Sequence, residues 1–359
     1  MDSLGRRAWA ATIRKGIVLC TSLIAIGVAT VASGAQWTAE ARMDALARAI
    51  VWQPPDVAPS AADLSHPPNR LPDDVTCRFK MTPLHGSVPK FTCVLPSGEL
   101  LRVKYRGPEP HGEVAASRLL LALGFGADHV GFVRRVRCVG CPWSPFATAA
   151  VVSLARADGL YERVARSNEA VDFEWVSVER RFAGEKIETD TVEGWAFHEL
   201  ARVKTASRIH ADALQLLAVF LAHWDNKSEN QRLICLSGPP GKDGRCKTPM
   251  ALLQDVGATF GPRKVNLEAW RTAAIWTDRA RCEIGMPDLP HGGATFTKVK
   301  VSEAGRRFLA ERLQAFSATQ IASLFRGARF EPRYGAVADW VQAFQARVAQ
   351  IADGAACPQ

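Results

Sequence analysis

A long apolar segment just past the middle of the chain runs directly into the polar sequence HWDNKSEN, residues 223–230. In the segment before it, residues 207–222, apolar side chains recur at helical spacing, which predicts a helix with one broad buried face. Such a helix would deliver His223, Asp225 and Asn230 at its exit. A surface loop needs no carboxylate and carboxamide at fixed spacing, whereas a site for metal and phosphate does.

A second motif follows after an insertion. Residues 236–245, LSGPPGKDGR, are rich in glycine and proline and predict a hairpin-like excursion. The apolar run at 251–253 then predicts a strand directly before Asp255, with Gly257 two positions further on. The chain order is therefore helix, H-x-D-x-x-x-x-N, insertion, strand and D-x-G.

The first half of the chain has the pattern of a small sheet. Residues 90–105, KFTCVLPSGELLRVKY, contain two apolar runs separated by Pro-Ser-Gly, a hairpin signal. In the second run Leu101 and Val103 alternate with Arg102 and Lys104, so the apolar side packs and the lysine side faces elsewhere. The following sequence GPEPHGEVAASRLLLALGFG predicts a helix that carries Glu113.

Further strands are predicted at 129–141 and 173–182, and the second half is mainly helical. Among its later helices, Ser317 with Gln320 predicts a capping box. A sheet-rich part followed by a helix-rich part indicates an α+β protein with two lobes, and ligands often bind between lobes.

In this order, the motifs resemble those of the protein-kinase-like superfamily: a lysine on a strand, a glutamate on the next helix, H-x-D-x-x-x-x-N, and a strand ending in D-x-G. The resemblance covers residues 80–265 in motif order rather than in continuous identity. It is closest to atypical members, namely lipid kinases, secretory-pathway kinases and toxin-type bacterial kinases. It implies a small antiparallel-sheet lobe with one helix and a mainly helical second lobe.

The resemblance also implies a role for each matching residue. Asp225 would be the catalytic base that accepts a hydroxyl proton. Asn230 and Asp255 would hold Mg²⁺ or Mn²⁺, hard ions that prefer oxygen ligands. Lys104 would bind the phosphates of ATP, and Glu113 would pair with Lys104.

Several positions depart from the family pattern. Trp224 stands where an arginine is usual, and Val256 stands where D-F-G has phenylalanine. There is no G-x-G-x-x-G; the nearest candidate is HGSVPKF, in which Gly86 and Ser87 would approach the phosphates. No Ala-Pro-Glu element is evident, which argues against a platform for peptide substrates.

The first 35 residues have the pattern of a secretory signal: basic residues, an uncharged segment at 16–32, and small Ser33 and Ala35 at the usual cleavage positions. The alternative is an uncleaved membrane anchor. Either reading makes the protein exported, to a periplasm or beyond. The expected divisions are a signal peptide (1–35), an Ala/Pro-rich tether (36–70), a sheet-rich lobe (71–190) and a helical lobe (191–359).

Eight cysteines lie outside this signal, and an even set in an exported protein predicts disulfides. Cys235 and Cys246 bracket the glycine- and proline-rich insertion, so we expect them to be bonded to each other. The sequence CVGC at 138–141 allows a structural disulfide, within the pair or to other cysteines, a redox motif or half of a zinc site.

The charge is mildly basic. The chain carries +9, of which residues 1–35 contribute +3 (four basic residues and Asp2), so the remainder carries +6. This suits phosphate-bearing ligands or an anionic membrane surface. No run of Lys and Arg is interleaved with aromatic residues, so nucleic acid is not an expected partner. Without G-x-S-x-G, a hydrolase is not suggested either.

The function expected from the sequence is that of an exported atypical kinase, which transfers a phosphoryl group from ATP to a protein, lipid or glycan acceptor. Membrane contact is expected only through an uncleaved anchor. Three alternatives stay open: a pseudokinase-like module that binds a ligand without chemistry, AMP transfer at the same site, and a structural envelope protein. In the last, Asp225 and Asp255 would only cap loops and would not converge.

Overall fold

The computed structural model describes residues 37–82, 84, 86–155, 169–262, 264–286 and 298–358, without the side chains of 153–155, 205 and 206. The expected signal peptide lies outside these residues. Residues 35–359 form one compact unit. Among the described residues, no helix is both long enough and apolar enough to cross a membrane.

Five strands in the first half close into a small barrel in the order β1-β2-β3-β5-β4. Their bounds are β1 (Asp74–Lys80), β2 (Lys90–Val94), β3 (Leu100–Lys104), β4 (His129–Val139) and β5 (Ala170–Arg180). The predicted hairpin is confirmed as β2–β3, in which Lys90 lies opposite Lys104. The expected small antiparallel sheet is corrected in one respect: β4 also pairs with β1 in parallel, which closes the sheet into a barrel. Closure leaves the sheet without an unpaired edge.

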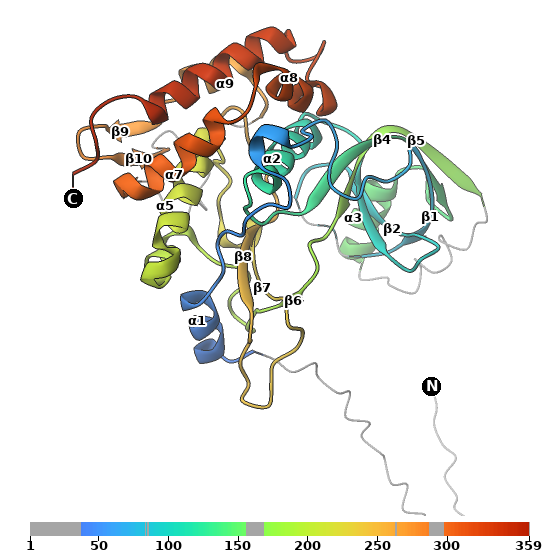
Figure 1. Ribbon diagram of the computed structural model, residues 1–359. Helices are drawn as coiled ribbons and strands as arrows, with labels where there is room; N and C mark the ends of the chain where they lie inside the picture. Colours follow the sequence, from blue (N-terminus) through green and yellow to red (C-terminus); the bar gives the residue numbers. More distant parts are fainter. Residues whose placement is uncertain are drawn as a thin grey trace, which may run out of the picture. The chain divides into compact units, whose positions relative to one another are not determined.

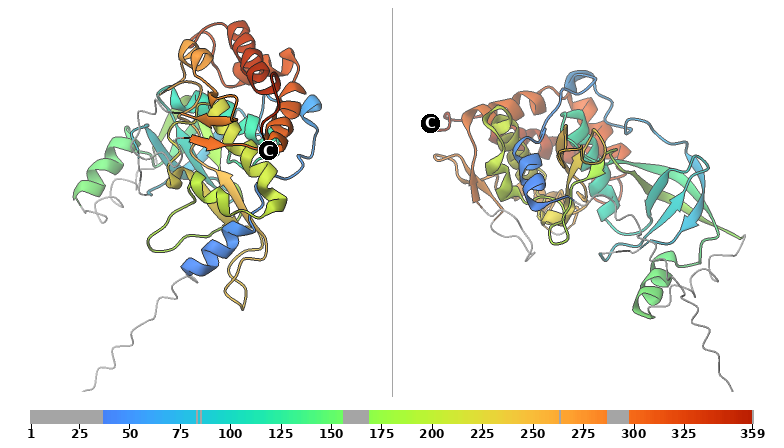
Figure 2. Two further views of the ribbon diagram at one scale, coloured as in Figure 1. Left: turned by 90° about the vertical axis from the view of Figure 1, so that its left-hand side faces the viewer. Right: turned by 90° about the horizontal axis from the view of Figure 1, so that it is seen from below.

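The barrel has its own apolar core, formed by inward-facing residues such as Phe91, Leu101 and Val136. Two disulfides border it: Cys77–Cys93 joins β1 to β2, and Cys138–Cys141 closes a tight turn after β4. The four sulfur-bearing residues are buried. Of the possibilities for CVGC, the structure therefore has the structural disulfide within the pair. An insertion follows that contains helix α3 (Pro145–Ala155), which lies beside the barrel and away from the later helices (Figure 2).

The second half is mainly helical, as predicted. Its longer helices are α5 (Thr205–Phe220), α7 (Glu303–Gln314), α8 (Ala318–Gly327) and α9 (Val337–Ala352). The predicted capping box begins α8, where Ser317 Oγ accepts from Gln320 N and Gln320 Oε1 accepts from Ser317 N. We call α5, α7, α8 and α9 the helical part (Figure 1).

Short elements complete this half. One three-stranded sheet has the order β6-β7-β8 and another the order β11-β10-β9. Their bounds are β6 (Glu185–Lys186), β7 (Gln231–Cys235), β8 (Pro249–Leu253), β9 (Trp276–Asp278), β10 (Glu283–Gly285) and β11 (Lys298–Lys300). The remaining helical turns are η1 (Pro59–Ala61), η2 (Phe197–Arg202), η3 (Ser228–Asn230) and α6 (Leu267–Thr272).

The largest apolar core joins segments from both halves. It contains the buried side chains of the helical part together with those of helix α2 (Glu109–Ala122), among them Val114, Leu119 and Leu120. Residues 37–64 belong to it as well: Leu46 on α1 (Ala39–Ala47) and Leu64 are almost fully buried. The expectation of a tether over the surface at 36–70 is therefore corrected, because its apolar side chains find buried partners. Helix α1 packs on β8 and η2, and Trp52 packs on His210 of α5 and Phe308 of α7.

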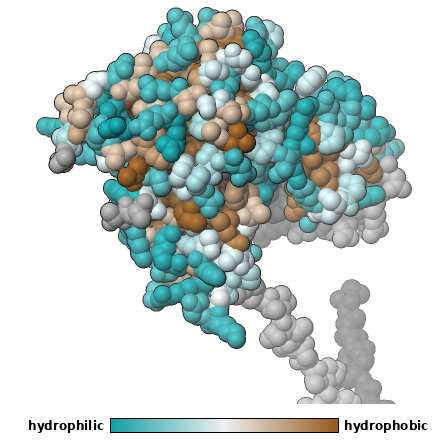
Figure 3. Space-filling view, in the orientation of Figure 1, coloured by the Kyte–Doolittle hydropathy of each residue, from teal (hydrophilic) through white to brown (hydrophobic). Residues whose placement is uncertain are grey.

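Two further disulfides fasten the second half. Cys235–Cys246 closes the glycine- and proline-rich insertion between β7 and β8, as predicted. Cys282–Cys357 ties the end of the chain to the turn before β10. Four disulfides are compatible with an exported protein. On the face shown in Figure 3, hydrophilic residues cover most of the surface.

Candidate active site

The lysine and glutamate predicted to pair are in contact. Lys104 lies at the end of β3, and its Nζ is 2.7 Å from Glu113 Oε1 on α2. Helix α2 begins at Glu109, so Glu113 lies in its second turn, close enough to span the nine positions from Lys104. Both side chains are buried. A buried ammonium group requires such a carboxylate, because an unpaired buried charge costs several kcal/mol.

Two more carboxylates reach the same ammonium group. Asp255, just after β8, places Oδ1 at 3.3 Å from Lys104 Nζ, and Glu109 Oε1 lies at 3.7 Å. Gly257 is necessary for this approach, since a Cβ at that position would overlap the Glu109 side chain. The D-x-G segment therefore packs directly on the first turn of α2.

The charged groups in this cluster shift one another's pKa values. Burial would raise the pKa of Asp255, but Lys104 and Lys90 outweigh it and hold the pKa at about 2. Burial lowers the pKa of Lys104, yet Asp255 and Glu113 raise it well above its usual value. Burial raises the pKa of Glu113 to about 8, against the attraction of Lys104. We take Lys104 as charged, because the ionised Asp255 stays beside it at neutral pH.

The loop HWDNKSEN is joined to Asp255 through its backbone. Asn230 Nδ2 donates to the carbonyl oxygen of Asp225 at 2.6 Å, which leaves its amide oxygen as an acceptor. The backbone N–H of Asp255 donates to the carbonyl oxygen of Asn230 at 3.3 Å. Lys227 Nζ lies 3.7 Å from Asp225 Oδ1. The two motifs, 25 residues apart from Asn230 to Asp255, thus meet at one place.

His223 supports this loop from inside. It is fully buried, and its backbone carbonyl accepts from Asn226 Nδ2 at 3.1 Å. Burial lowers the pKa of its imidazole to about 4, although Asp225 and Asp255 both pull in the opposite direction. The ring is therefore neutral at physiological pH. A neutral, fully buried ring of this kind is suited to supporting the loop.

The loop between β1 and β2 carries the predicted Gly86 and Ser87. Gly86 has φ +80°, a left-handed conformation suited to glycine. A Cβ at Gly86 would lie 3.5 Å from Nζ of Lys90. No hydrogen bond of Ser87 places it at the Lys104 cluster within the part of the chain that the structure describes. Its role in phosphate binding stays a prediction.

Lys90 is one of three residues of this site that sequence reasoning missed. It is 6% exposed and lies opposite Lys104 across the β2–β3 pair, so both ammonium groups are on one side of the sheet. Burial and the neighbouring Lys104 lower its pKa, against the pull of Asp255. The signal was available, because KFTCV is an apolar strand that begins with a lysine. Lys227, two positions after Asp225, and Glu109 were also missed.

The protein side chains around Asp255 supply only some of the ligands that a divalent ion would need. No group of three or more His, Cys, Asp or Glu side chains in the described residues could hold a metal ion. Asp255 nevertheless offers an ionised carboxylate that is about one-third exposed, and Asn230 offers its amide oxygen. Mg²⁺ is commonly held by one or two carboxylates, with phosphate and water as the other ligands. The residues therefore fit a metal that arrives with a phosphorylated ligand.

Comparisons with known proteins identify kinases among solved structures. The chain is similar to a Helicobacter pylori proinflammatory kinase, CtkA, with a TM-score of 0.44 and 10% identity over 77% of this chain and 93% of that chain. It is also similar to the Golgi casein kinase with Mn and ADP bound, with a TM-score of 0.36 and 12% identity over 77% of this chain and 71% of that one. No protein-family model and no curated protein matches the sequence.

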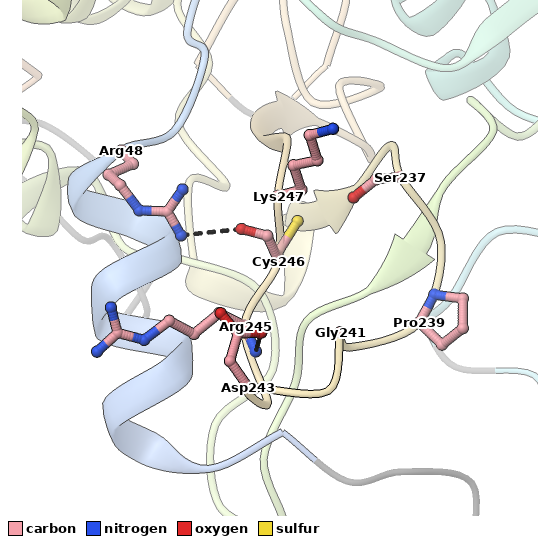
Figure 4. Close-up of a pocket in the computed structure, with 8 residues that line it drawn as sticks. All are labelled: Arg48, Ser237, Pro239, Gly241, Asp243, Arg245, Cys246 and Lys247. Carbon is pink, nitrogen blue, oxygen red and sulfur yellow. Dashed lines mark hydrogen bonds between the residues drawn. The ribbon is translucent and has the colours of Figure 1, made fainter.

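A separate cavity of about 600 Å³ lies at the disulfide-closed insertion (Figure 4). Its lining includes Arg48, Arg245 and Lys247, and Arg48 donates to the carbonyl oxygen of Cys246 at 2.9 Å. Arg48 and Arg245 both approach the carboxylate of Asp44. None of the lining residues belongs to the Lys104 cluster, so this cavity is not part of the candidate active site.

Proposed function

We propose that this protein is an atypical kinase that transfers the terminal phosphoryl group of ATP to an acceptor hydroxyl. The observation that carries the proposal is the contact of Lys104 with both Glu113 and Asp255, at 2.7 and 3.3 Å. These residues come from a barrel strand, a helix and the segment after β8, so their meeting is not a local accident of sequence. Phosphoryl transfer requires positioning and charge neutralisation, and this cluster offers both.

Each residue then has a chemical task. Lys104 and Lys90 would hold phosphate oxygens from the barrel side. Asp225 would accept the proton of the attacking hydroxyl. The ammonium group of Lys227 would partly offset the negative charge of the Asp225 carboxylate. Asn230 and Asp255 would hold Mg²⁺ or Mn²⁺. The metal, when bound, would neutralise charge on the transferring phosphoryl group.

The acceptor is not specified by these residues; protein, lipid and glycan hydroxyls all suit the same chemistry. The structural-protein alternative required Asp225 and Asp255 to lie apart. Against it, both carboxylates act on the pKa of His223 and of Glu109. Export to a periplasm or beyond is part of the proposal, and the four disulfides support it.

A pseudokinase-like ligand-binding protein is the second candidate. The observation that favours it is the ion pair between Lys104 and Asp255, because that pair engages two groups that a nucleotide and its metal would need. This candidate predicts nucleotide binding that is weak or independent of metal, without turnover.

Thermal unfolding of the oxidised protein with ATP and Mn²⁺ or Mg²⁺ tests the site. A ligand at about a hundred times its dissociation constant adds roughly 2.7 kcal/mol to stability. We expect a metal-dependent rise in Tm that Asp255→Asn abolishes and that Asp339→Asn, a control at an exposed position on α9, retains. Absence of a shift with either metal would refute nucleotide binding.

Labelled ATP then separates the chemistries. Label at the γ-phosphate should move to an acceptor or to water, and Asp225→Asn should slow this at least a hundredfold. Transfer of label from the α-phosphate would indicate AMP transfer instead. A Tm shift with no transfer of either label would favour the pseudokinase-like candidate.

A further inference from the structure

Helix α2 carries Glu113, yet its apolar side chains do not belong to the core of the barrel. Val114, Leu119 and Leu120 pack with the helical part, whereas Lys104 extends from a barrel strand whose neighbours form a separate core. The Lys104–Glu113 ion pair therefore joins two elements whose apolar side chains belong to different cores. In kinases this pair must be in place for activity, and the position of the helix is a common point of control.

One hydrogen bond fastens α2 to the end of α8. His111 Nδ1 lies 2.9 Å from the carbonyl oxygen of Ala328. A carbonyl only accepts, so Nδ1 carries the hydrogen and donates. Ala328 is the C-cap of α8, where helix carbonyls lack partners within the helix. The imidazole of His111 thus donates a hydrogen bond to the buried carbonyl oxygen of Ala328. Without this donor the carbonyl would be unpaired, which would destabilise the fold.

Aromatic packing holds the imidazole in place. The ring of His111 lies 5.0 Å from that of Phe132 on β4 and 5.2 Å from that of Tyr334, which follows α8. Its side chain is buried, and burial together with nearby Arg333 and Arg329 lowers its pKa. The contact needs a hydrogen on Nδ1, which the neutral Nδ1–H tautomer supplies.

Two further contacts of α2 follow His111 along the helix. A Cβ at Gly112 would lie 2.8 Å from the carbonyl oxygen of Gly257, so the first turn of α2 rests on the D-x-G segment. Seven residues after His111, buried Arg118 lies so close to Gly327 that a Cβ there would overlap its guanidinium. The His111 bond and the Arg118 contact therefore hold α2 against α8 along two turns, and Figure 1 shows the two helices near each other.

We propose that His111 is a positioning residue: its bond to Ala328 locks α2 onto the helical part and presents Glu113 to Lys104 before any ligand binds. The site is then assembled without phosphorylation or a partner protein, and α2 stays with α8 if the site opens. The consequence for catalysis rests on the proposed function, whereas the lock itself does not.

Hydrogen exchange on the full, oxidised chain tests the lock without any activity. We expect the amides of α2 to be protected as strongly as those of α8, and their protection to be unchanged by ATP with Mn²⁺. His111→Phe keeps the ring and removes the donor, so it should weaken protection of α2 selectively. His111→Asn restores a donor and should recover most of it. His198→Phe, at an exposed histidine on η2, should leave α2 unaffected.

Kinetics provide the second readout. If the protein transfers phosphate, His111→Phe should lower kcat about tenfold with KM for ATP changed less than twofold, as expected for loss of one buried hydrogen bond that positions rather than binds. His111→Asn should restore kcat. The proposal is overturned if α2 exchanges as fast as the barrel strands, if α2 becomes protected only with nucleotide, or if His111→Phe leaves α2 exchange unchanged. An inactive wild-type protein would refute the proposed function, and exchange would still decide on the lock.

Discussion

Lys90 shows how a single residue can be important without any motif to mark it. Burial and the neighbouring Lys104 lower the pKa of Lys90, which means that its charged form destabilises the folded protein. A negatively charged ligand at this place would offset that destabilisation. A polyphosphate would do so, because its oxygens would attract both ammonium groups. Lys90 then complements Lys104 where the usual glycine-rich sequence is missing.

We therefore predict that Lys90→Met raises KM for ATP about tenfold, the effect of losing one charge-assisted hydrogen bond, without lowering stability. Methionine keeps the apolar stem and removes the buried charge. Enzyme kinetics and the ligand-induced Tm shift measure the two effects. Lys80→Met, at an exposed position on β1, is the matched control and should behave as wild type. An unchanged KM in Lys90→Met would contradict a role in phosphate binding.

His223 predicts a pH dependence of stability. Its folded pKa of about 4 lies below the unfolded value of 6.5, so the contribution of the neutral ring is complete above pH 6.5 and is lost as pH falls through 4. The shift corresponds to roughly 3 kcal/mol. Urea unfolding at pH 7 and pH 4 should show a smaller loss on acidification for His223→Phe than for wild type. Equal losses of stability in the two proteins would mean that protonation of His223 does not destabilise the folded protein.

At the scale of elements, α2 is the helix on which the site depends, because it contacts the barrel, the D-x-G segment and α8. Gly112 is the point of closest approach, at which an added Cβ would lie 2.8 Å from Gly257 O. Alanine favours helices over glycine by about 1 kcal/mol. We predict that Gly112→Ala nevertheless destabilises the protein and weakens nucleotide binding, since the helix must move away from Gly257. Thermal unfolding with and without ATP and Mn²⁺ measures both, and a more stable variant would show that α2 has room to move.

The barrel shows which features of a sheet depend on strand pairing rather than on the local sequence pattern. Alternation within 90–105 predicts two strands and the hairpin that joins them, and both are observed. No short window of sequence predicts that β1 pairs with β4 in parallel, since this pair joins residues such as Val75 and Val136, which lie far apart in the chain. Closure of the barrel is a property of all five strands together.

At the scale of the whole molecule, the Cys282–Cys357 disulfide spans 75 residues that include α7, α8 and α9. In the chain-entropy view, a cross-link closing a loop of this length stabilises by about 4 kcal/mol, against about 3 kcal/mol for the shorter Cys235–Cys246 loop. Replacing each pair by alanine and measuring urea unfolding under oxidising conditions should give the larger loss for Cys282 and Cys357. Equal losses would show that native contacts, rather than loop length, determine the effect.

The sequence alone determined what depends on neighbours along the chain. Helical spacing, the Ser317 capping box, the β2–β3 hairpin and the Cys235–Cys246 pair are each encoded within a short window, and each is observed. The chain order of Lys104, Glu113, Asp225, Asn230 and Asp255 also needed no structure, because order is independent of packing.

Tertiary structure decided which of these side chains meet and which core each element joins. It brought Lys104 to Glu113 and Asp255, added the unmarked Lys90, and packed apolar side chains of residues 37–64 into the largest core in place of a tether. It also attached α2 to α8 through His111 and Ala328, residues 217 positions apart. The physical reason is the same throughout: burial and ion pairing depend on distance in space, which no local pattern specifies.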